Sequence, residues 1–351
     1  MRGAAGWCVE RVVPHALRVG GLFILLVVVS LPGTTSAAPV STTETTLQPA
    51  SQPVDVPPVA PEQAAPEQSV QLIRESTSDG PSELLAERVL PPPPSVYGDA
   101  QVVAFYGYPN NPRMGALGAY RTIDAAAEAV TVVASEYDAL NGGRDVIPAL
   151  HLIVAVAQPR PEDDGTYLER MSRANIEQYV TITRQRGMLL ILDLQIGWGD
   201  PLRETQRIGW ALEKPWVHLA LDPEWATRRA GVAPGEVIGS LAAVDVNAVQ
   251  QYLAEIVYEY RLPPKTLVLH QFQRQMLRDP ETYLDFSGVE LVIDMDGFGS
   301  EYAKLTNYEV FSLAEYAERP AIKLFYEQDT PTMSPQRIQI LDDPPDLVIY
   351  Q

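Results

Sequence analysis

The chain contains 351 residues, with 45 acidic and 26 basic side chains and a net charge of −19. This surplus of negative charge repels a phosphate backbone, which argues against a nucleic-acid-binding function. A single cysteine excludes an internal disulfide framework and a zinc site built on cysteines. The length admits one large domain or two of ordinary size.

The N-terminus has the pattern of an export signal. Arg2, Arg11 and Arg18 are followed by an unbroken apolar run that extends over residues 19–29. A membrane-spanning helix needs about 20 apolar residues, so this shorter run is typical of the core of a secretory signal. We predict a signal peptide over residues 1–37, cleaved before Ala38, and a secreted or cell-envelope protein. The alternative is an uncleaved leader that anchors the chain in the membrane.

The next segment is rich in proline. Residues 39–97 hold 12 of the 31 prolines, and Thr, Ser, Gln, Ala and Glu fill most of the remainder. Such a segment buries too little apolar surface to offset the entropy lost on ordering. We predict a disordered linker over residues 38–97. Within it, residues 82–90 have a capping serine and an apolar face, and we expect a short helix that docks on the following domain.

From residue 98 onward, apolar runs alternate with helical patterns. Eight runs rich in Val, Ile and Leu lie at residues 102–106, 150–157, 188–194, 217–221, 266–270, 291–293, 321–326 and 347–350. Helical patterns lie between them at residues 123–140, 167–186, 246–260, 300–318 and 335–341. Eight βα units in about 250 residues are typical of a (β/α)8 barrel.

We therefore predict an α/β fold, a TIM barrel over residues 98–351. The competing doubly wound sheet usually has a glycine-rich phosphate-binding turn after its first strand, and none follows residue 106. No helical pattern follows the eighth run. We expect residues 82–90 to cover the seam between the eighth and first strands.

Polar and aromatic side chains gather where the predicted strands end, the edge at which barrels of this kind place their active sites. Acidic residues follow four runs, at Asp193, Asp222, Glu224, Asp294, Asp296 and Glu327. Aromatic, amide and imidazole side chains occupy the same ends, at Tyr106, Tyr108, Gln195, Trp198, Trp225, His270, Gln271, Tyr326 and Gln351. We predict that these residues line one functional pocket.

Carboxylates interleaved with aromatic rings are typical of a site that cleaves sugars. One carboxylic acid protonates the glycosidic oxygen, a second carboxylate attacks or activates water, and the rings stack on the sugar. We predict Glu224 as the general acid/base and Glu327 as the nucleophile or second carboxylate. Asp222 points to the same side as Glu224, and it either takes part in catalysis or accepts hydrogen bonds that orient the loop. We predict that the other residues of the pocket bind the substrate.

Two resemblances rest on these carboxylates. Glu224 and Glu327, after the fourth and seventh runs, resemble the acid pair of the large clan of retaining barrel glycosidases, which usually has Asn where this chain has Pro223. Asp222-x-Glu224, with a closing run that ends in Tyr350-Gln351, resembles the DxE motif of barrel muramidases that cut peptidoglycan. The whole domain looks most similar to uncharacterised exported bacterial barrel proteins. The resemblances imply a glycosidase-like hydrolase that acts on a cell-wall or extracellular glycan.

Two other functions remain open. Asp193, Asp222, Glu224, Asp294 and Asp296 offer oxygen ligands for one hard cation, Ca²⁺ or Mg²⁺, in a cation-dependent hydrolase. The alternative without catalysis is a barrel that only binds a glycan. We expect no other cofactor, and a monomer.

The histidines are scattered along the chain, which argues against a histidine-rich zinc or two-metal centre. We expect His151 at a strand start, His218 in the core, and His270 at a strand end as a hydrogen-bonding group or general base. The long connection over residues 225–245 is the expected lid.

Overall fold

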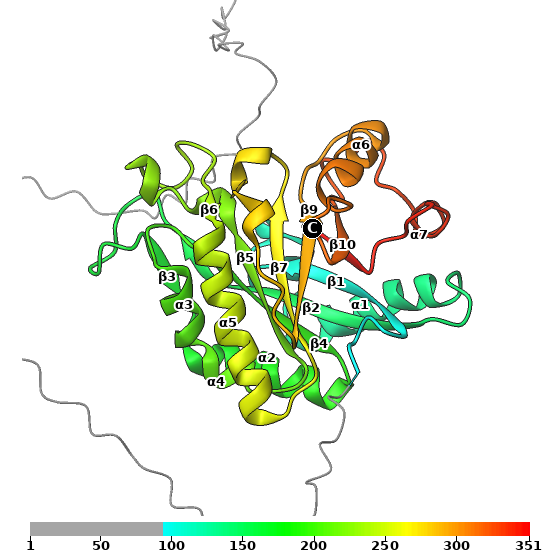
Figure 1. The fold of residues 1–351 in the computed structure, drawn as a ribbon. Coiled ribbons are helices and arrows are strands. Elements are labelled where there is room, and N and C mark those ends of the chain that lie inside the picture. The colour runs from blue at the N-terminus through cyan, green and yellow to red at the C-terminus, as the bar shows by residue number, and fades with distance from the viewer. Residues whose placement is uncertain (1–93) are drawn as a thin grey trace, which may run out of the picture. The chain divides into compact units, whose positions relative to one another are not determined.

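The computed structural model describes residues 94–351, which form a closed barrel of eight parallel strands (Figure 1). In chain order these are β1 (Ala100–Gly107), β2 (Asp145–Ala157), β4 (Leu189–Gln195), β5 (Val217–Asp222), β7 (Lys265–Gln271), β9 (Val289–Met295), β10 (Arg319–Leu324) and β11 (Leu347–Tyr350). β1 pairs with both β2 and β11, which closes the ring. The predicted α/β barrel is confirmed.

The helices lie around the outside of the strands (Figure 1). They are α1 (Ile123–Asp138), α2 (Arg173–Arg186), α3 (Pro201–Arg207), α4 (Gly209–Leu212), α5 (Ala243–Tyr260), α6 (Glu301–Phe311) and α7 (Pro335–Gln339). Side-chain oxygens of Thr122, Ser172 and Ser300 cap the N-termini of α1, α2 and α6. None of the helices in this part of the chain is both long and apolar enough to cross a membrane.

Three short strands lie outside the barrel. β3 (Leu168–Arg170) runs antiparallel along the C-terminal end of β2. β6 (Leu241–Ala242) and β8 (Leu277–Arg278) pair with each other and so join the connections that follow β5 and β7. Extra strands at this end strengthen the loops that surround the barrel mouth.

Successive residues of each strand face two separate cores. The outer core lies between the strands and the helices and contains Val103 and Phe105 of β1. The inner core fills the barrel and contains Val102, Ala104 and Tyr106 of the same strand. This alternation follows from the period of two residues in a strand, and it decides which polar side chains enter the barrel.

The first described residues close the N-terminal end of the barrel. Tyr97 is 3% exposed and belongs to the inner core, and its hydroxyl lies 3.3 Å from the Thr266 hydroxyl. Arg319 lies over the Tyr97 ring, and Ser95 donates a hydrogen bond to Glu290. Residues 95–97, which were predicted as the end of the linker, therefore belong to the barrel.

Several element boundaries differ from those predicted. α2 begins at Arg173 because residues 168–170 form β3 instead of the first helical turn. β2 begins at Asp145, five residues before the predicted run, and so pairs with β1 along its whole length. β10 ends at Leu324 because the Asp329 carboxylate accepts a hydrogen bond from the Phe325 amide and starts a turn there.

No helix follows β11 in the described chain, as predicted. The predicted signal peptide, nearly all of the predicted linker and the helix expected over residues 82–90 lie outside the described residues.

Candidate active site

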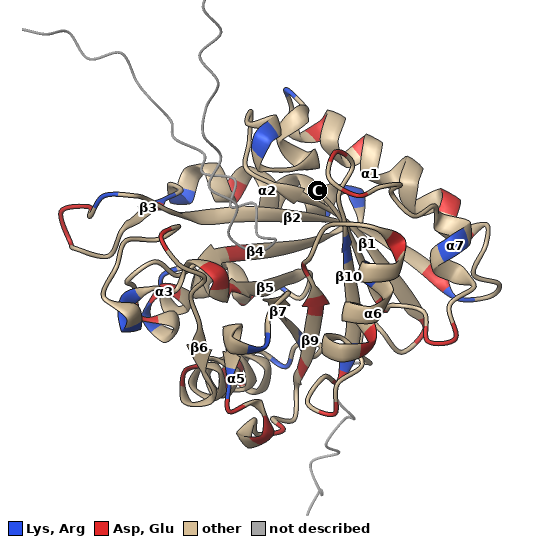
Figure 2. Cartoon of the chain, turned by 90° about the horizontal axis from the view of Figure 1, so that it is seen from above, with Lys and Arg blue, Asp and Glu red and all other residues tan. Residues whose placement is uncertain are grey.

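Seven of the eight barrel strands send a polar side chain into the upper part of the barrel. In each case the residue two positions earlier belongs to the inner core, so the strand period places the polar group inside. These side chains are those of Tyr106, His151, Asp193, Asp222, His270, Asp294 and Lys323, and all are buried. Figure 2 shows acidic positions on β4 and β9 and a basic position on β10, within the ring of strands. Charge is therefore concentrated inside the barrel.

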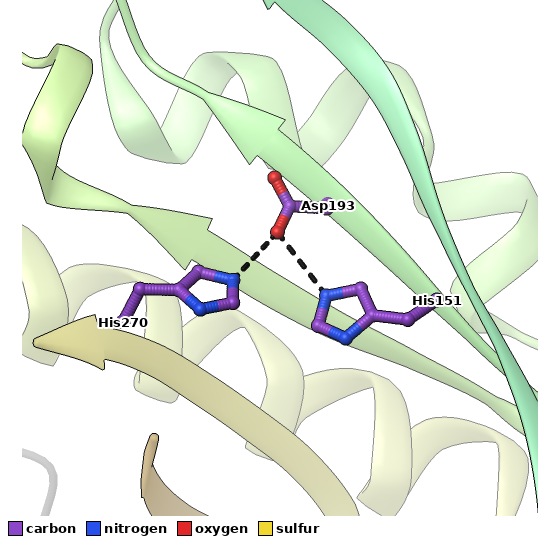
Figure 3. Close-up of side chains that lie close together, drawn as sticks. All are labelled: His151, Asp193 and His270. Carbon is purple, nitrogen blue, oxygen red and sulfur yellow. Dashed lines mark hydrogen bonds and ion pairs between the residues drawn. The ribbon is translucent and has the colours of Figure 1, made fainter. Parts of the chain in front are cut away.

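Two histidines share one carboxylate oxygen at the centre (Figure 3). Asp193 Oδ2 lies 3.1 Å from His151 Nε2 and 2.7 Å from His270 Nε2. The two imidazole rings stack with their centroids 5.4 Å apart. The other nitrogen of His270, Nδ1, lies 2.8 Å from Asp294 Oδ2. His270 therefore bridges two carboxylates from different strands.

These contacts define where the protons are. A carboxylate only accepts hydrogen bonds, so both nitrogens of His270 carry a proton and the ring is a cation. Burial and the nearby Lys323 act to lower the pKa of His270, but the hydrogen bonds to Asp193 and Asp294 outweigh them and raise it to about 10. Burial lowers the pKa of His151 to about 4, so this ring is neutral and donates through Nε2.

The carboxylates that touch His270 are ionised. Burial acts to raise the pKa of Asp193, but the hydrogen bonds from His151 and His270 outweigh it and hold that pKa below its usual value. In Asp294, the His270 hydrogen bond and the Lys323 charge likewise overcome burial and lower the pKa. The central unit therefore consists of a cationic imidazole held between two anions.

A second cation and a third carboxylate lie beside this unit. Lys323 Nζ is 2.7 Å from Asp296 Oδ2, 3.3 Å from His270 Nδ1 and 4.0 Å from the centroid of the Tyr106 ring. Burial acts to lower the pKa of Lys323, but Asp296 and Asp294 outweigh it and raise that pKa. Burial raises the pKa of Asp296, and Lys323 opposes this rise. Lys323 therefore balances the charge of β9.

The turn after β5 carries the most easily protonated carboxylates. Burial raises the pKa of Asp222 to about 7. Burial, together with the charges of Asp222 and Asp296, raises the pKa of the half-buried Glu224 to about 8. Asp222 Oδ1 accepts a hydrogen bond from the Glu224 amide at 3.1 Å. Asp222 therefore orients the turn, and Glu224 keeps its proton at neutral pH.

The buried charges of this centre do not cancel. Asp193, Asp294 and Asp296 face two cations, Lys323 and His270, while Asp222 and Glu224 add further acidic capacity. Three atoms within this network have no hydrogen-bond partner among the described residues: His151 Nδ1, Asp193 Oδ1 and Asp294 Oδ1. The centre is therefore negative overall and retains buried groups that can bind a ligand or water.

Most of the predicted carboxylates meet here. Asp193, Asp222, Glu224, Asp294 and Asp296 belong to one set of interacting charges, with Tyr106 and His270 in contact with it. The ring of Tyr106 lies edge-on to the rings of His151 and His270 and is 4% exposed. In this structure Tyr106 thus packs on the charged network and presents little of its face to a sugar.

Other predicted residues lie away from this centre. Glu327 is exposed in the turn after β10, and no hydrogen bond or ion pair joins it to Glu224. Tyr326 is 49% exposed and stacks on Tyr350 at 5.1 Å, on the outer side of the strands. Gln351 pairs through its backbone with Leu324 and Tyr326. The end of the chain therefore builds the seam beside β11.

Three predicted residues, Gln195, Gln271 and Trp198, hold the surrounding loops. Gln195 Oε1 accepts a hydrogen bond from the Ala157 amide, and Gln271 Oε1 accepts one from the Tyr316 hydroxyl. The half-buried Trp198 donates its indole N–H to the Val232 carbonyl at 2.9 Å. Trp225 is also half-buried, in the turn η3 (Pro223–Trp225). Tyr108 follows β1 and lines a groove described below.

Two central residues were missed from the sequence. The view of the histidines as scattered was wrong, because β2 begins earlier than expected and places His151 in mid-strand, beside Asp193. Lys323 was not considered at all. A charged residue in the middle of an apolar run was the available signal for the lysine, and the structure shows that it points inward, two positions after the inner-core Ala321. His218 is a buried core histidine, as expected, and its Nδ1 accepts from the Thr266 amide.

A buried lysine on α6 fixes the two strand ends that carry Asp296 and Lys323. Lys304 is 1% exposed and donates to the Gly297 carbonyl at 2.7 Å and to the Lys323 carbonyl at 2.6 Å. Its ammonium pairs with Asp329 at 3.1 Å. We call Lys304 and Asp329, with the backbone groups they hold, the α6 clamp.

The connection over residues 225–245 is tied down at several points. The Val232 carbonyl accepts hydrogen bonds from Trp198 and from the Thr227 hydroxyl. Gly239 donates its amide to the Glu224 carbonyl, and a Cβ at Gly239 would lie only 2.6 Å from the Ala226 nitrogen. This close approach requires glycine, and it holds the turn of Glu224 from outside.

No known protein family, no curated protein and no solved structure matches the chain.

Proposed function

We propose that the barrel is a glycoside hydrolase with Glu224 as its general acid. The observation that carries this proposal is the raised pKa of Glu224, about 8, next to a buried group of ionised carboxylates. Glycosidic cleavage needs a carboxylic acid that still holds its proton at neutral pH and a second carboxylate that does not. The raised pKa of Glu224 and the ionised Asp193 and Asp294, within one set of interacting charges, support both requirements.

The overall charge of the pocket also suits this reaction. The transition state resembles an oxocarbenium ion and is positive. A buried surplus of carboxylate over Lys323 and His270 stabilises a positive charge that develops above it. An anionic transition state, such as that of phosphoryl or acyl transfer, would be repelled.

Asp296 is our candidate for the second carboxylate, the role that the sequence predicts for Glu327. Asp296 lies at the mouth-side end of β9, is 9% exposed at its side chain, and contributes to the raised pKa of Glu224. Burial raises the pKa of Asp296, and its ion pair with Lys323 opposes this rise and favours the charged form. Asp222 then serves as the group that orients Glu224.

The test compares three variants for release of new reducing ends from soluble neutral polysaccharides and peptidoglycan. Glu224→Gln and Asp296→Asn should each lower kcat by about 10²–10⁴, the usual contribution of general acid–base catalysis, while binding persists. Glu327→Gln should have little effect, and Glu236→Gln, on the same connection as Glu224, is the matched surface control.

Several outcomes contradict this proposal. Full activity in Glu224→Gln would show that Glu224 is not the general acid. A loss of activity in Glu327→Gln would support the pair predicted from the sequence, Glu224 and Glu327. A chain that binds glycans but never releases reducing ends is a binding module.

A divalent cation is the second candidate, favoured by the convergence of His151 Nε2, Asp193 Oδ2 and His270 Nε2, which lie within 4.8 Å of one another. Two imidazoles and a carboxylate suit Zn²⁺, Mn²⁺ or Fe²⁺ better than Ca²⁺ or Mg²⁺. The contacts of both His270 nitrogens with the carboxylates of Asp193 and Asp294 favour a protonated ring over a metal ligand. Loss of activity with a chelator, restored by one of these ions, would support the metal-dependent reading.

We also propose that the enzyme acts outside the cytoplasmic membrane, as the leader over residues 1–37 indicates. N-terminal sequencing of the protein recovered from the medium or cell envelope should begin at Ala38. An intact leader would mean that it anchors the chain.

A further inference from the structure

A groove lies at the end of β1, the strand that carries Tyr106. It has a volume of about 330 Å³ and lies between the connection that follows β1 and the first turns of α1 and α2. This volume falls at the small end of the range for small-molecule sites, about 300–1,000 Å³. None of the residues discussed above as catalytic lines it.

Tyr108 connects this groove to the barrel interior. Its ring packs against the inner core and also lines the groove. Tyr106, two residues earlier in the chain, contacts His151, His270 and Lys323. Two residues of extended chain span about 7 Å, so along the backbone the groove begins about 7 Å beyond Tyr106, which packs on the charged centre.

The lining of the groove differs from the rest of this acidic protein. It contains no Asp or Glu, although the whole chain carries 45 of them, and its one charged residue is the exposed Arg121. The rings of Tyr108, Tyr120 and Tyr179 supply flat apolar surface. The side-chain amides of Asn175 and Gln178, on neighbouring turns of α2, supply donors and acceptors. Rings combined with neutral amides suit a ligand with hydroxyl groups, and the Arg121 guanidinium can also donate hydrogen bonds to such groups.

Polar groups of the groove are available to a ligand. Among the described residues, the hydroxyls of Tyr108, Tyr120 and Tyr179 and the side-chain amide of Asn175 form no hydrogen bond that meets the usual geometric criteria. Burial raises the pKa of Tyr179 to about 12, so its hydroxyl keeps its proton and can donate. These groups provide several directional contacts in a confined space.

The walls of the groove are already ordered. Ser172 and Thr122 cap α2 and α1 at the groove. The Asn111 side chain caps the single turn η1 (Pro112–Met114), and Asn111 and Tyr108 form an isolated bridge. A site that is formed before binding loses less conformational entropy when a ligand enters.

We infer that this groove is a glycan subsite, which binds the neutral sugars next to the one cleaved at the charged centre. The inference rests on the proposed glycosidase function and extends it: the substrate is an uncharged oligosaccharide or polysaccharide chain that spans both places. A substrate that reaches only the charged centre would leave the groove unused.

The test measures binding of neutral cello- and N-acetyl-chito-oligosaccharides of increasing length by calorimetry. The full chain with Glu224→Gln is used, so that hydrolysis does not consume the ligand. Affinity should rise with chain length until the groove is filled and then stay constant. Asn175→Ala combined with Gln178→Ala should remove roughly tenfold of this gain, the loss expected for one or two good polar contacts.

Controls separate this effect from damage to the fold. Both substitutions lie on the exposed face of α2, where alanine favours the helix, so the melting temperature should not fall. Gln251→Ala, on the exposed face of α5, removes a comparable amide elsewhere and should leave the gain with length unchanged.

Each outcome bears on one proposal. If affinity does not depend on length, or the α2 variant keeps the full gain, the subsite is refuted even when Glu224 proves catalytic. If the gain is present and the α2 variant loses it, but the unsubstituted chain releases no reducing ends, the subsite stands and the hydrolase proposal fails. A peptide of residues 51–66 that binds in the groove while the sugars do not would make it a proline-rich docking site and overturn the inference.

Discussion

Asp222 and Glu224 lie in one turn, and the charge of the first influences the acidity of the second. Burial is the main reason that the pKa of Glu224 is raised to about 8, and the Asp222 carboxylate adds to the rise. A general acid works only while protonated, so activity should be lost as the pH rises through about 8.

Asp222→Asn should move this loss of activity to lower pH. The asparagine keeps an oxygen that can accept from the Glu224 amide, but it removes the negative charge that raises the pKa of Glu224. The pH dependence of kcat/KM measures the shift. An unchanged upper limb would mean that another group supplies the proton.

His270 should matter more for stability than His151. His270→Gln leaves Asp193 and Asp294 buried without their shared cation, at a cost of about 3–5 kcal/mol. His151→Gln removes one neutral hydrogen-bonding group and should cost about 1–3 kcal/mol. Urea unfolding at neutral pH measures both, and equal losses would contradict a charged His270.

The pH dependence of the same variants provides an independent check. The folded-state pKa of His270, about 10, lies above the ordinary value of about 6.5, so protonation stabilises the fold fully below that ordinary value. This stabilisation is lost as the pH rises through about 10. The difference in unfolding free energy between the unsubstituted chain and His270→Gln should therefore shrink in that range.

Residues near the ends of the predicted apolar runs were easier to predict than residues in the middle of a run. Asp193, Asp222, Glu224, His270, Asp294 and Asp296 stand at or after the ends of apolar runs, and the barrel rule brings such positions together. His151 and Lys323 lie inside their strands. Their direction depends on which neighbours face inward, and that follows from the closed ring of strands, not from local pattern.

At the scale of elements, the α6 clamp joins parts of the chain that are otherwise independent. Lys304 reaches the ends of both β9 and β10, and Asp329 accepts hydrogen bonds from the amides of Gly299 and Phe325. The relative placement of Asp296 and Lys323 therefore depends on a buried ion pair on the outer side of the strands.

Lys304→Met should destabilise the fold by about 3–5 kcal/mol, because it leaves the Asp329 carboxylate buried and unpaired. Adding Asp329→Asn removes the isolated charge, so the double variant should lose less than the sum of the two single losses. Chemical unfolding of the three variants gives the coupling energy. Strictly additive losses would show that the pair does not act as a unit.

Element boundaries were predictable only where a local signal marks them. α1 starts as predicted because Thr122 caps it, and α5 ends as predicted at Tyr260. Residues 168–170 read as part of a helix, but pairing with the extended end of β2 makes them a strand. That pairing is a tertiary contact, which overrides local preference.

At the scale of the whole molecule, the barrel is closed from below by a residue that the sequence placed in the linker. Tyr97 follows four consecutive prolines and looks like the end of a spacer. Its burial depends on the hollow end of the barrel, which exists only after all eight strands have met. The composition of the sequence alone could not show that Tyr97 belongs to the barrel.

Tyr97→Ala should cost about 3–5 kcal/mol, as for other large aromatic side chains removed from a core. Tyr97→Phe loses only the contact with Thr266 and should cost about 0.5–1.5 kcal/mol. Thermal and chemical melts of the full chain measure both. Similar small losses in the two variants would place Tyr97 outside the folding unit.

The overall architecture was predictable because the number and spacing of apolar runs restrict the fold to very few choices. The arrangement of the charged side chains inside the barrel was less predictable. Sequence order spreads the central groups from Tyr106 to Lys323, and only closure of the ring brings them into contact.

The distribution of this network over β2, β4, β7, β9 and β10 has a consequence for how the chain folds. A partly assembled sheet that lacks β10 would bury Asp294 and Asp296 without Lys323, and one that lacks β7 would leave Asp193 and Asp294 without the imidazolium between them. Such intermediates must keep their centre hydrated. Water can therefore leave the barrel interior only when the last strands have joined the sheet. The charged centre thus favours the complete barrel over any partly assembled sheet.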